Sequence, residues 1–131
     1  MKFYDTEVDF DITNPEQYDA YGQLIQKFKA ATEESGGDFK ALMVKSYEAV
    51  KAGAEALFGR EAAEQLCGEK VSARRAMRLY CALLDDYKAQ LDEFEALKAN
   101  IETMFPQEVE LAEAGVEASK TAAESVLQPA T

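Results

Sequence analysis

Residues 72–106 read SARRAMRLYCALLDDYKAQLDEFEALKANIETMFP, and this stretch decides the fold class. It begins with Ser72, a good helix N-cap, and no glycine or proline interrupts it before Pro106. We therefore predict one helix of about 33 residues, which at 1.5 Å per residue is about 50 Å long. A globule of about 100 residues is only about 30 to 35 Å across. Part of this helix is therefore expected to extend past the core.

Apolar residues recur along this predicted helix at steps of three and four and form one stripe. The stripe consists of Met77, Tyr80, Leu84, Tyr87, Leu91, Phe94, Leu97, Ile101 and Met104. Its spacing approaches a coiled-coil seam, with one irregular step between Phe94 and Leu97. Such stripes are more often core than recognition surface. The alternative is that its outer part binds a partner helix through Tyr87, Leu91, Phe94, Leu97 and Ile101.

Residues 106–131 carry a weaker stripe of the same kind. It consists of Val109, Ala112, Val116, Ser119, Ala123 and Val126. Because it is rich in alanine and interrupted by Gly115, its packing contributes less per residue than a stripe of leucine and phenylalanine. We therefore divide the chain into a helical domain, 1–105, and a loosely attached amphipathic helix, 106–131. This extension could cover the long helix in its own chain or exchange between chains, and yield to a partner helix.

The sequence upstream of residue 72 predicts a small β element and three helices. Residues 3–12 alternate apolar and polar side chains like a half-buried strand, and residues 1–4 could pair back through an Asp5-Thr6 turn or through a longer or bulged one. Asn14 and Pro15 begin a helix that runs to Ser35-Gly36-Gly37, and Gln17 completes a capping box. A second helix follows Asp38 and stops at Gly59, and a short helical turn, 60–66, is closed by Gly68.

The two longer upstream helices also carry apolar stripes. The first comprises Tyr18, Tyr21, Leu24, Ile25, Phe28 and Ala31. The second comprises Phe39, Leu42, Met43, Tyr47, Val50, Ala54, Leu57 and Phe58. Together these patterns predict a mainly α fold: a helical bundle with a small N-terminal β-hairpin or strand and a long C-terminal helix pair.

Composition and charge narrow the classes of partner. The 131 residues are 47% hydrophobic and carry a formal net charge of −11, which is typical of one acidic globular domain. Phosphate binding needs basic surface, so nucleic acid is not an expected partner, and an anionic membrane repels such a chain as well. The sequence has no apolar run of the about 20 residues that a membrane span needs, and no signal-peptide core. We expect a cytoplasmic protein whose partners are proteins.

The sequence contains no recognisable catalytic, metal-binding or cofactor-binding set. It has no histidine and only two cysteines, Cys67 and Cys81, which we expect to be reduced and buried. Carboxylates on the long helix lack the Glu-x-x-His pairs of di-iron bundles and are expected to be solvated. A calcium loop beginning at Asp9 would need glycine at its sixth position, where Asn14 stands. We therefore expect no enzyme, no metal and no cofactor.

Arg74, Arg75 and Arg78 are unusual because they lie in the first two turns of the predicted helix, where the macrodipole disfavours cations. One interpretation is that they pair with acidic residues of the preceding segment, namely Glu61, Glu64 and Glu69. The other is an exposed basic patch that docks an acidic or helical partner.

Four short motifs resemble a family of small prophage proteins of Gram-positive bacteria, similar to phage tail assembly chaperones. The motifs are Met1-Lys2-Phe3 through Val8-Asp9-Phe10-Asp11, Glu16-Gln17-Tyr18, Leu57-Phe58-Gly59 and Leu66-Cys67-Gly68. The resemblance covers roughly residues 1–95. Family members favour an Asn-Gly type turn in place of Asp5-Thr6, and Phe-Gly-Gly in place of Cys67-Gly68-Glu69.

The resemblance implies a cytoplasmic assembly factor of the bacterial host cell, with no catalytic residues. Its client would be the tape-measure protein, whose long, aggregation-prone helical segments it would shield during tail assembly. Such a chaperone is expected to be a monomer or a small homo-oligomer. The alternative from the same context is a virion structural or head-tail connector protein, which would form a stable high-order ring.

Overall fold

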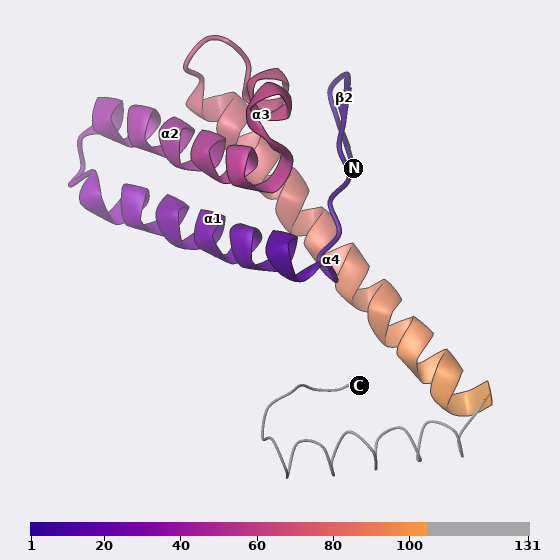
Figure 1. Ribbon diagram of the computed structural model, residues 1–131. Helices are drawn as coiled ribbons and strands as arrows, with labels where there is room; N and C mark the ends of the chain where they lie inside the picture. The colour runs from indigo at the N-terminus through magenta and orange to yellow at the C-terminus, as the bar shows by residue number, and fades with distance from the viewer. Residues whose placement is uncertain (105–131) are drawn as a thin grey trace. The chain divides into compact units, whose positions relative to one another are not determined.

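The computed structural model describes residues 1–104, and 77% of them are helical. The elements follow in the order β1 (Lys2–Phe3), β2 (Thr6–Glu7), α1 (Pro15–Glu34), α2 (Phe39–Phe58), α3 (Arg60–Cys67) and α4 (Ala73–Met104) (Figure 1). This order confirms the mainly α fold with a small N-terminal hairpin. The predicted helix in 106–131, and with it the helix pair, lies outside the described residues. Contacts divide the chain into two units, Met1–Gln90 and Leu91–Thr131.

Local capping chemistry places the start of α1. The side chain of Asn14 accepts a hydrogen bond from the backbone N–H of Gln17 at 3.1 Å, as predicted. The Gln17 side chain does not complete a capping box. Its Oε1 accepts from the N–H of Asp11 at 2.7 Å, and its Nε2 donates to the carbonyls of Asp9 and Leu57 at 2.9 and 3.2 Å. Gln17 therefore ties the segment before α1 to the end of α2.

The N-terminal hairpin is shorter than the predicted strand and turns one residue earlier. β1 and β2 pair antiparallel, with Phe3 opposite Thr6. The turn residues are Tyr4 and Asp5, so the predicted Asp5-Thr6 turn is wrong. Tyr4 has a φ of 53°, a left-handed conformation that is uncommon outside glycine. Residues 8–12 leave the sheet but keep the predicted alternation of buried and exposed side chains.

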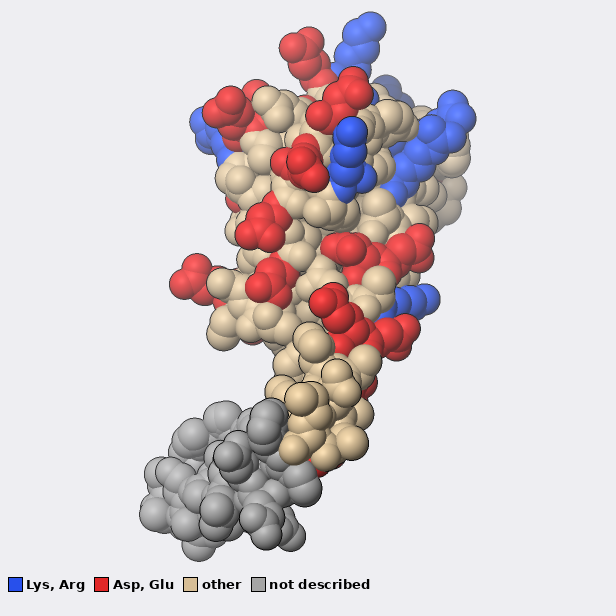
Figure 2. All heavy atoms as spheres, turned by 90° about the vertical axis from the view of Figure 1, so that its right-hand side faces the viewer, with Lys and Arg blue, Asp and Glu red and all other residues tan. Residues whose placement is uncertain are grey.

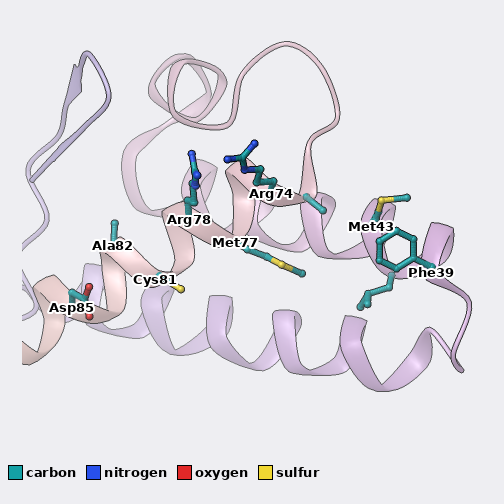
Figure 3. A pocket seen from close by; sticks show the side chains of 10 residues that line it. Phe39, Met43, Arg74, Met77, Arg78, Cys81, Ala82 and Asp85 are labelled. Carbon is teal, nitrogen blue, oxygen red and sulfur yellow. The ribbon is translucent and has the colours of Figure 1, made fainter.

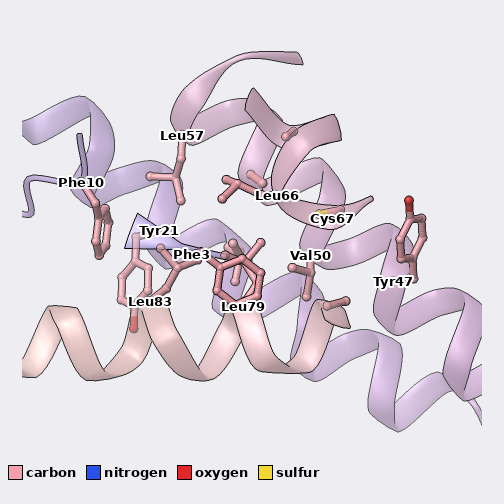
Figure 4. Close-up of a cluster of buried hydrophobic side chains, with 14 of the residues drawn as sticks. Phe3, Phe10, Tyr21, Tyr47, Val50, Leu57, Leu66, Cys67, Leu79 and Leu83 are labelled. Carbon is pink, nitrogen blue, oxygen red and sulfur yellow. The ribbon is translucent and has the colours of Figure 1, made fainter. Parts of the chain in front are cut away.

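The core of the Met1–Gln90 unit gathers side chains from the hairpin and from all four helices (Figure 4). Leu24, Val50, Leu66, Leu79 and Leu83 are fully buried at its centre. Gly59, with φ at 95°, separates α2 from α3 and turns α3 back against α2, a conformation that favours glycine. A single core therefore orients the helices of this unit.

Some predicted core positions are not buried. On α4 the core face is Ala76, Leu79 and Leu83, whereas Met77 is 36% exposed. Tyr18 on α1 and Phe39 on α2 are also exposed, at 52% and 70%. The predicted stripes are thus wrong at these positions. Tyr18 and Phe39 both lie in the first turn of a helix.

Aromatic rings join α4 to α1. Tyr21 stacks on Tyr87 with ring centroids 4.9 Å apart, and Phe28 stacks on Tyr80 at 4.3 Å. In each helix the two rings are seven residues apart, and they pair in opposite order, so the helices run in opposite directions at this contact. Tyr87 therefore belongs to the core of this unit.

Gln90 fixes the segment before α1 against α4. Its Oε1 accepts from the N–H of Ile12 at 2.8 Å, and its Nε2 donates to the carbonyl of Phe10 at 2.7 Å. Asp86, one turn earlier, accepts from the same amide at 2.9 Å. Both backbone groups belong to residues whose side chains are buried, so Gln90 satisfies polar groups that enter the core.

Candidate protein-binding surfaces

An open groove of about 690 Å³ lies between the first half of α2 and the first half of α4 (Figure 3). We call it the α2/α4 groove. Its lining residues are Phe39, Leu42, Met43, Ala73, Arg74, Met77, Arg78, Cys81, Ala82 and Asp85. All of them lie within the Met1–Gln90 unit.

The lining of the α2/α4 groove is mainly apolar. Phe39 is 70% exposed and Met77 is 36% exposed, while Leu42 and Met43 are half-buried. Methionine side chains are flexible and polarizable, so they adapt to partners of different shape. Exposed apolar surface of this kind, with charged residues at its edge, is typical of protein-binding sites.

Arg75 does not belong to the groove, and its contacts explain a cation at the start of α4. Its Nε donates to the carbonyl of Leu66 at 2.8 Å and its Nη2 to the carbonyl of Gln65 at 2.9 Å. These carbonyls end α3, where the helix dipole favours positive charge. The guanidinium also lies 4.5 Å from the ring centroid of Tyr4, in the turn of the hairpin.

Arg74 and Arg78 lie one turn apart on α4 and form one margin of the groove. In Figure 3 they extend from α4 in the same direction, away from Met77 and Cys81. Arg78 donates to the Tyr4 hydroxyl at 3.1 Å, and this bond to a cation lowers the pKa of Tyr4. The predicted pairing of the arginines with Glu61, Glu64 or Glu69 is wrong: within residues 1–104 the Arg75 side chain donates to carbonyls, Arg78 donates to the Tyr4 hydroxyl, and the Arg74 side chain has no hydrogen-bond partner.

The charged residues that line the groove are two arginines and one aspartate, whereas the whole chain has a net charge of −11. Acidic side chains are spread over the face shown in Figure 2, whereas most of its lysines and arginines gather toward one end. α4 begins at Ala73, directly before Arg74, so the positive end of its helix dipole lies beside the arginines. Asp85 is the one acidic lining residue. The α2/α4 groove thus has a basic margin and an acidic end.

The second candidate surface is a row of apolar side chains near the end of α4. Every residue from Leu91 to Met104 is exposed. The apolar ones follow steps of three and four, and we call them the α4 row: Leu91, Phe94, Leu97, Ile101 and Met104, with exposures of 41, 48, 53, 54 and 64%. Four residues of the predicted recognition surface therefore lie in this row, and Tyr87 does not.

The two cysteines differ in environment. Cys67 is buried, and burial raises the pKa of its thiol to about 11. Cys81 is exposed in the α2/α4 groove, so the prediction that it is buried is wrong.

Asp11 accepts from both the N–H and the hydroxyl of Thr13, at 2.9 and 2.6 Å, as in an Asx turn. These bonds give Asp11, one of the residues considered for a calcium loop, a structural role at the entry to α1.

Two further observations concern only residues 1–104. No helix there has the length and apolar character to cross a membrane. No three cysteine or acidic side chains there converge as a metal site would require.

The family model for a family of unknown function, DUF6673, matches residues 4–108. The chain belongs to this family. The match spans the hairpin turn, all four helices and a few residues beyond α4, so both candidate surfaces lie within the DUF6673 region. No curated protein and no solved structure matches the chain. The family description names no activity, so the resemblance to tail assembly chaperones stays a prediction.

The α2/α4 groove as a whole was not predicted from the sequence. Phe39 and Met77 both fit helical stripes, so the sequence predicts them in the core. One indication was available: Phe39 is the first residue of its helix, directly after the Asp38 cap, and such a position lies at the edge of any helix contact.

Proposed function

We propose that this DUF6673 protein is a non-enzymatic assembly factor that shields helical, aggregation-prone segments of a client protein. The observation that carries the proposal is the α4 row, five large apolar side chains at helical spacing that are 41 to 64% exposed. An amphipathic client helix fits such a row through its own residues at three- and four-residue steps.

The more specific proposal is a phage tail assembly chaperone whose client is the tape-measure protein, in the cytoplasm of a bacterial host. The sequence motifs that resemble prophage proteins support it. An acidic chain is suited to this role because its charge keeps the complex soluble while the apolar client helix is covered.

The size of the α4 row favours transient binding. Full burial of a leucine or phenylalanine side chain stabilises by about 1.5 to 3 kcal/mol, so a half-exposed one has about 1 kcal/mol left to gain. Five such residues supply about 5 kcal/mol, which is similar to the lower estimates of the free-energy cost of association, about 4 to 15 kcal/mol. A client would therefore be released readily, as a chaperone requires.

The test is co-expression with the tape-measure protein encoded in the same genome. We expect the protein to keep it soluble and to elute with it as a monomer or small oligomer. Leu97→Glu with Ile101→Glu should abolish both effects. The matched control, Ala99→Glu with Thr103→Glu, adds equal charge at two exposed positions one turn apart on the opposite side of α4 and should bind normally.

Two results would refute the proposal. Equal client solubility with the row variant and the control would show that the α4 row is not the binding surface. A fixed high-order ring of the purified protein would favour the virion structural or connector alternative.

A further inference from the structure

We infer that the α2/α4 groove is a second and separate binding site, and that its occupant is an amphipathic helix of another protein with acidic residues beside its apolar stripe. This inference goes beyond the proposed function. It does not depend on the α4 row, because the groove lies entirely within residues 1–90.

The apolar lining indicates that the groove binds apolar side chains of a helix and not a small molecule. Small-molecule sites surround their ligand and place several polar groups to orient it. The groove is instead open, and its apolar lining includes the exposed Phe39 and Met77 and the half-buried Met43. A helix that inserts residues at three- and four-residue steps covers this lining without being enclosed.

The arginines at the margin of the groove favour a bound helix that carries acidic residues. Arg74 and Arg78 are both exposed, and Arg74 has no hydrogen-bond partner among the 104 described residues. Carboxylates of a bound helix can therefore reach two guanidinium groups, one turn apart, without displacing an ion pair made within residues 1–104. The first turn of α4 adds the positive end of its dipole on the same side.

Asp85 and the arginines carry opposite charges at different points along the groove, and this difference orients a bound helix. Asp85 lies 11 positions after Arg74 on the same helix, about 16 Å along the axis. A helix alongside α4 would place its carboxylates toward Arg74 and Arg78 and a neutral or basic residue toward Asp85. Salt screens this attraction beyond about one Debye length, about 8 Å at physiological salt, so it acts locally on a chain whose net charge is −11.

The test uses the full chain and two synthetic 18-residue helical peptides as probes. Both carry leucines at three- and four-residue steps. One has three glutamates beside the leucines, and the other has lysines in their place. We expect the wild-type protein to bind the acidic peptide at least tenfold more tightly than the basic one, measured by fluorescence anisotropy. Bound acidic peptide should also slow alkylation of Cys81, which lies in the groove, while buried Cys67 serves as an internal reference.

Charge-reversal variants show which residues cause the preference for the acidic peptide. Arg74→Glu with Arg78→Glu should abolish or reverse it, whereas Lys88→Glu with Lys98→Glu changes the net charge equally outside the groove and should leave it intact. Arg74→Glu alone should weaken acidic-peptide binding while keeping the bond from Arg78 to Tyr4. Leu97→Glu with Ile101→Glu, on the α4 row, should have no effect, which separates this site from the proposed function.

Four outcomes would overturn the inference. The first is equal binding of the two peptides, and the second is acidic-peptide binding that leaves Cys81 unprotected. The third is binding that appears only when the tail glutamates of 107–131 are replaced by glutamine, which would assign the groove to the chain's own tail. The fourth is a dimer dispersed by the double arginine variant, which would assign it to a second copy.

Discussion

A buried glycine at the contact of α1 and α2 allows the helices to approach closely, and replacing it tests the packing that positions α2. Gly53 lies within α2 and is buried. A Cβ atom built there would overlap the side chain of Leu24 on α1, which is itself fully buried. The overlap includes the Cβ of Leu24, at 2.7 Å, so a change of rotamer cannot relieve it. In Gly53→Ala the helices themselves must separate.

Two opposing terms set the size of the effect. Alanine is more favourable than glycine inside a helix by about 1 kcal/mol. Overpacking a core costs about 1 to 3 kcal/mol, and the upper value applies where only a backbone shift relieves the clash. The net loss in the free energy of unfolding is then about 2 kcal/mol, which lowers Tm by roughly 6 to 10 °C in a chain of this size.

Gly22→Ala is the matched control. Gly22 lies in α1, and a Cβ there would meet nothing within 4 Å. Gly22→Ala gains the higher helix propensity of alanine but causes no clash of the kind that Gly53→Ala makes with Leu24. It should therefore raise the free energy of unfolding by about 0.5 to 1 kcal/mol. Urea unfolding followed by circular dichroism at 222 nm measures both variants. If Gly53→Ala were as stable as Gly22→Ala, the close packing of α2 on α1 would be refuted.

Three further predictions concern single side chains. Gln90→Leu leaves the Phe10 carbonyl and the Ile12 N–H without partners and should lower the free energy of unfolding in urea by about 2 to 4 kcal/mol; a loss below about 0.5 kcal/mol would contradict the role of Gln90. In thiol titration of the native protein, Cys81 should react at once and Cys67 only on unfolding; two fast thiols would show that Cys67 is accessible. The folded-state pKa of Cys67, about 11, exceeds its ordinary 9.0, so the stability that it contributes is complete below pH 9 and lost as pH rises toward 11. The free energy of unfolding should therefore fall more steeply across that window than in Cys67→Ala, and equal slopes would contradict the burial of the thiol.

The helix boundaries were predictable from the sequence because capping is local chemistry. Asn14, Asp38 and Gly59 act within a few residues of their own positions, and each one ends or begins the element that the sequence predicted. The register of the hairpin was not predictable in this way. It is set by the burial of Phe3 and by the contact of Arg75 with Tyr4, and both depend on residues far along the chain.

The buried face of α4 was misassigned because two stripes overlap on this helix. Met77, Tyr80 and Leu84 follow three- and four-residue steps, but so do Ala76, Leu79 and Leu83. Periodicity alone does not choose between neighbouring faces. In the structure Ala76, Leu79 and Leu83 are fully buried, and from the other stripe Tyr80 and Tyr87 stack on α1 while Met77 stays exposed and lines the groove.

The two candidate surfaces share one helix but differ in charge, and this difference argues that they serve different partners. Residues 91–104 carry four acidic side chains, Asp92, Glu93, Glu95 and Glu102, and one basic side chain, Lys98. A helix rich in carboxylates is attracted to Arg74 and Arg78 at the groove but repelled beside the α4 row. A neutral or basic client helix fits the α4 row. At the groove, a basic client helix is repelled by Arg74 and Arg78. Since a single amphipathic helix cannot satisfy both environments, we expect the two sites to be occupied independently.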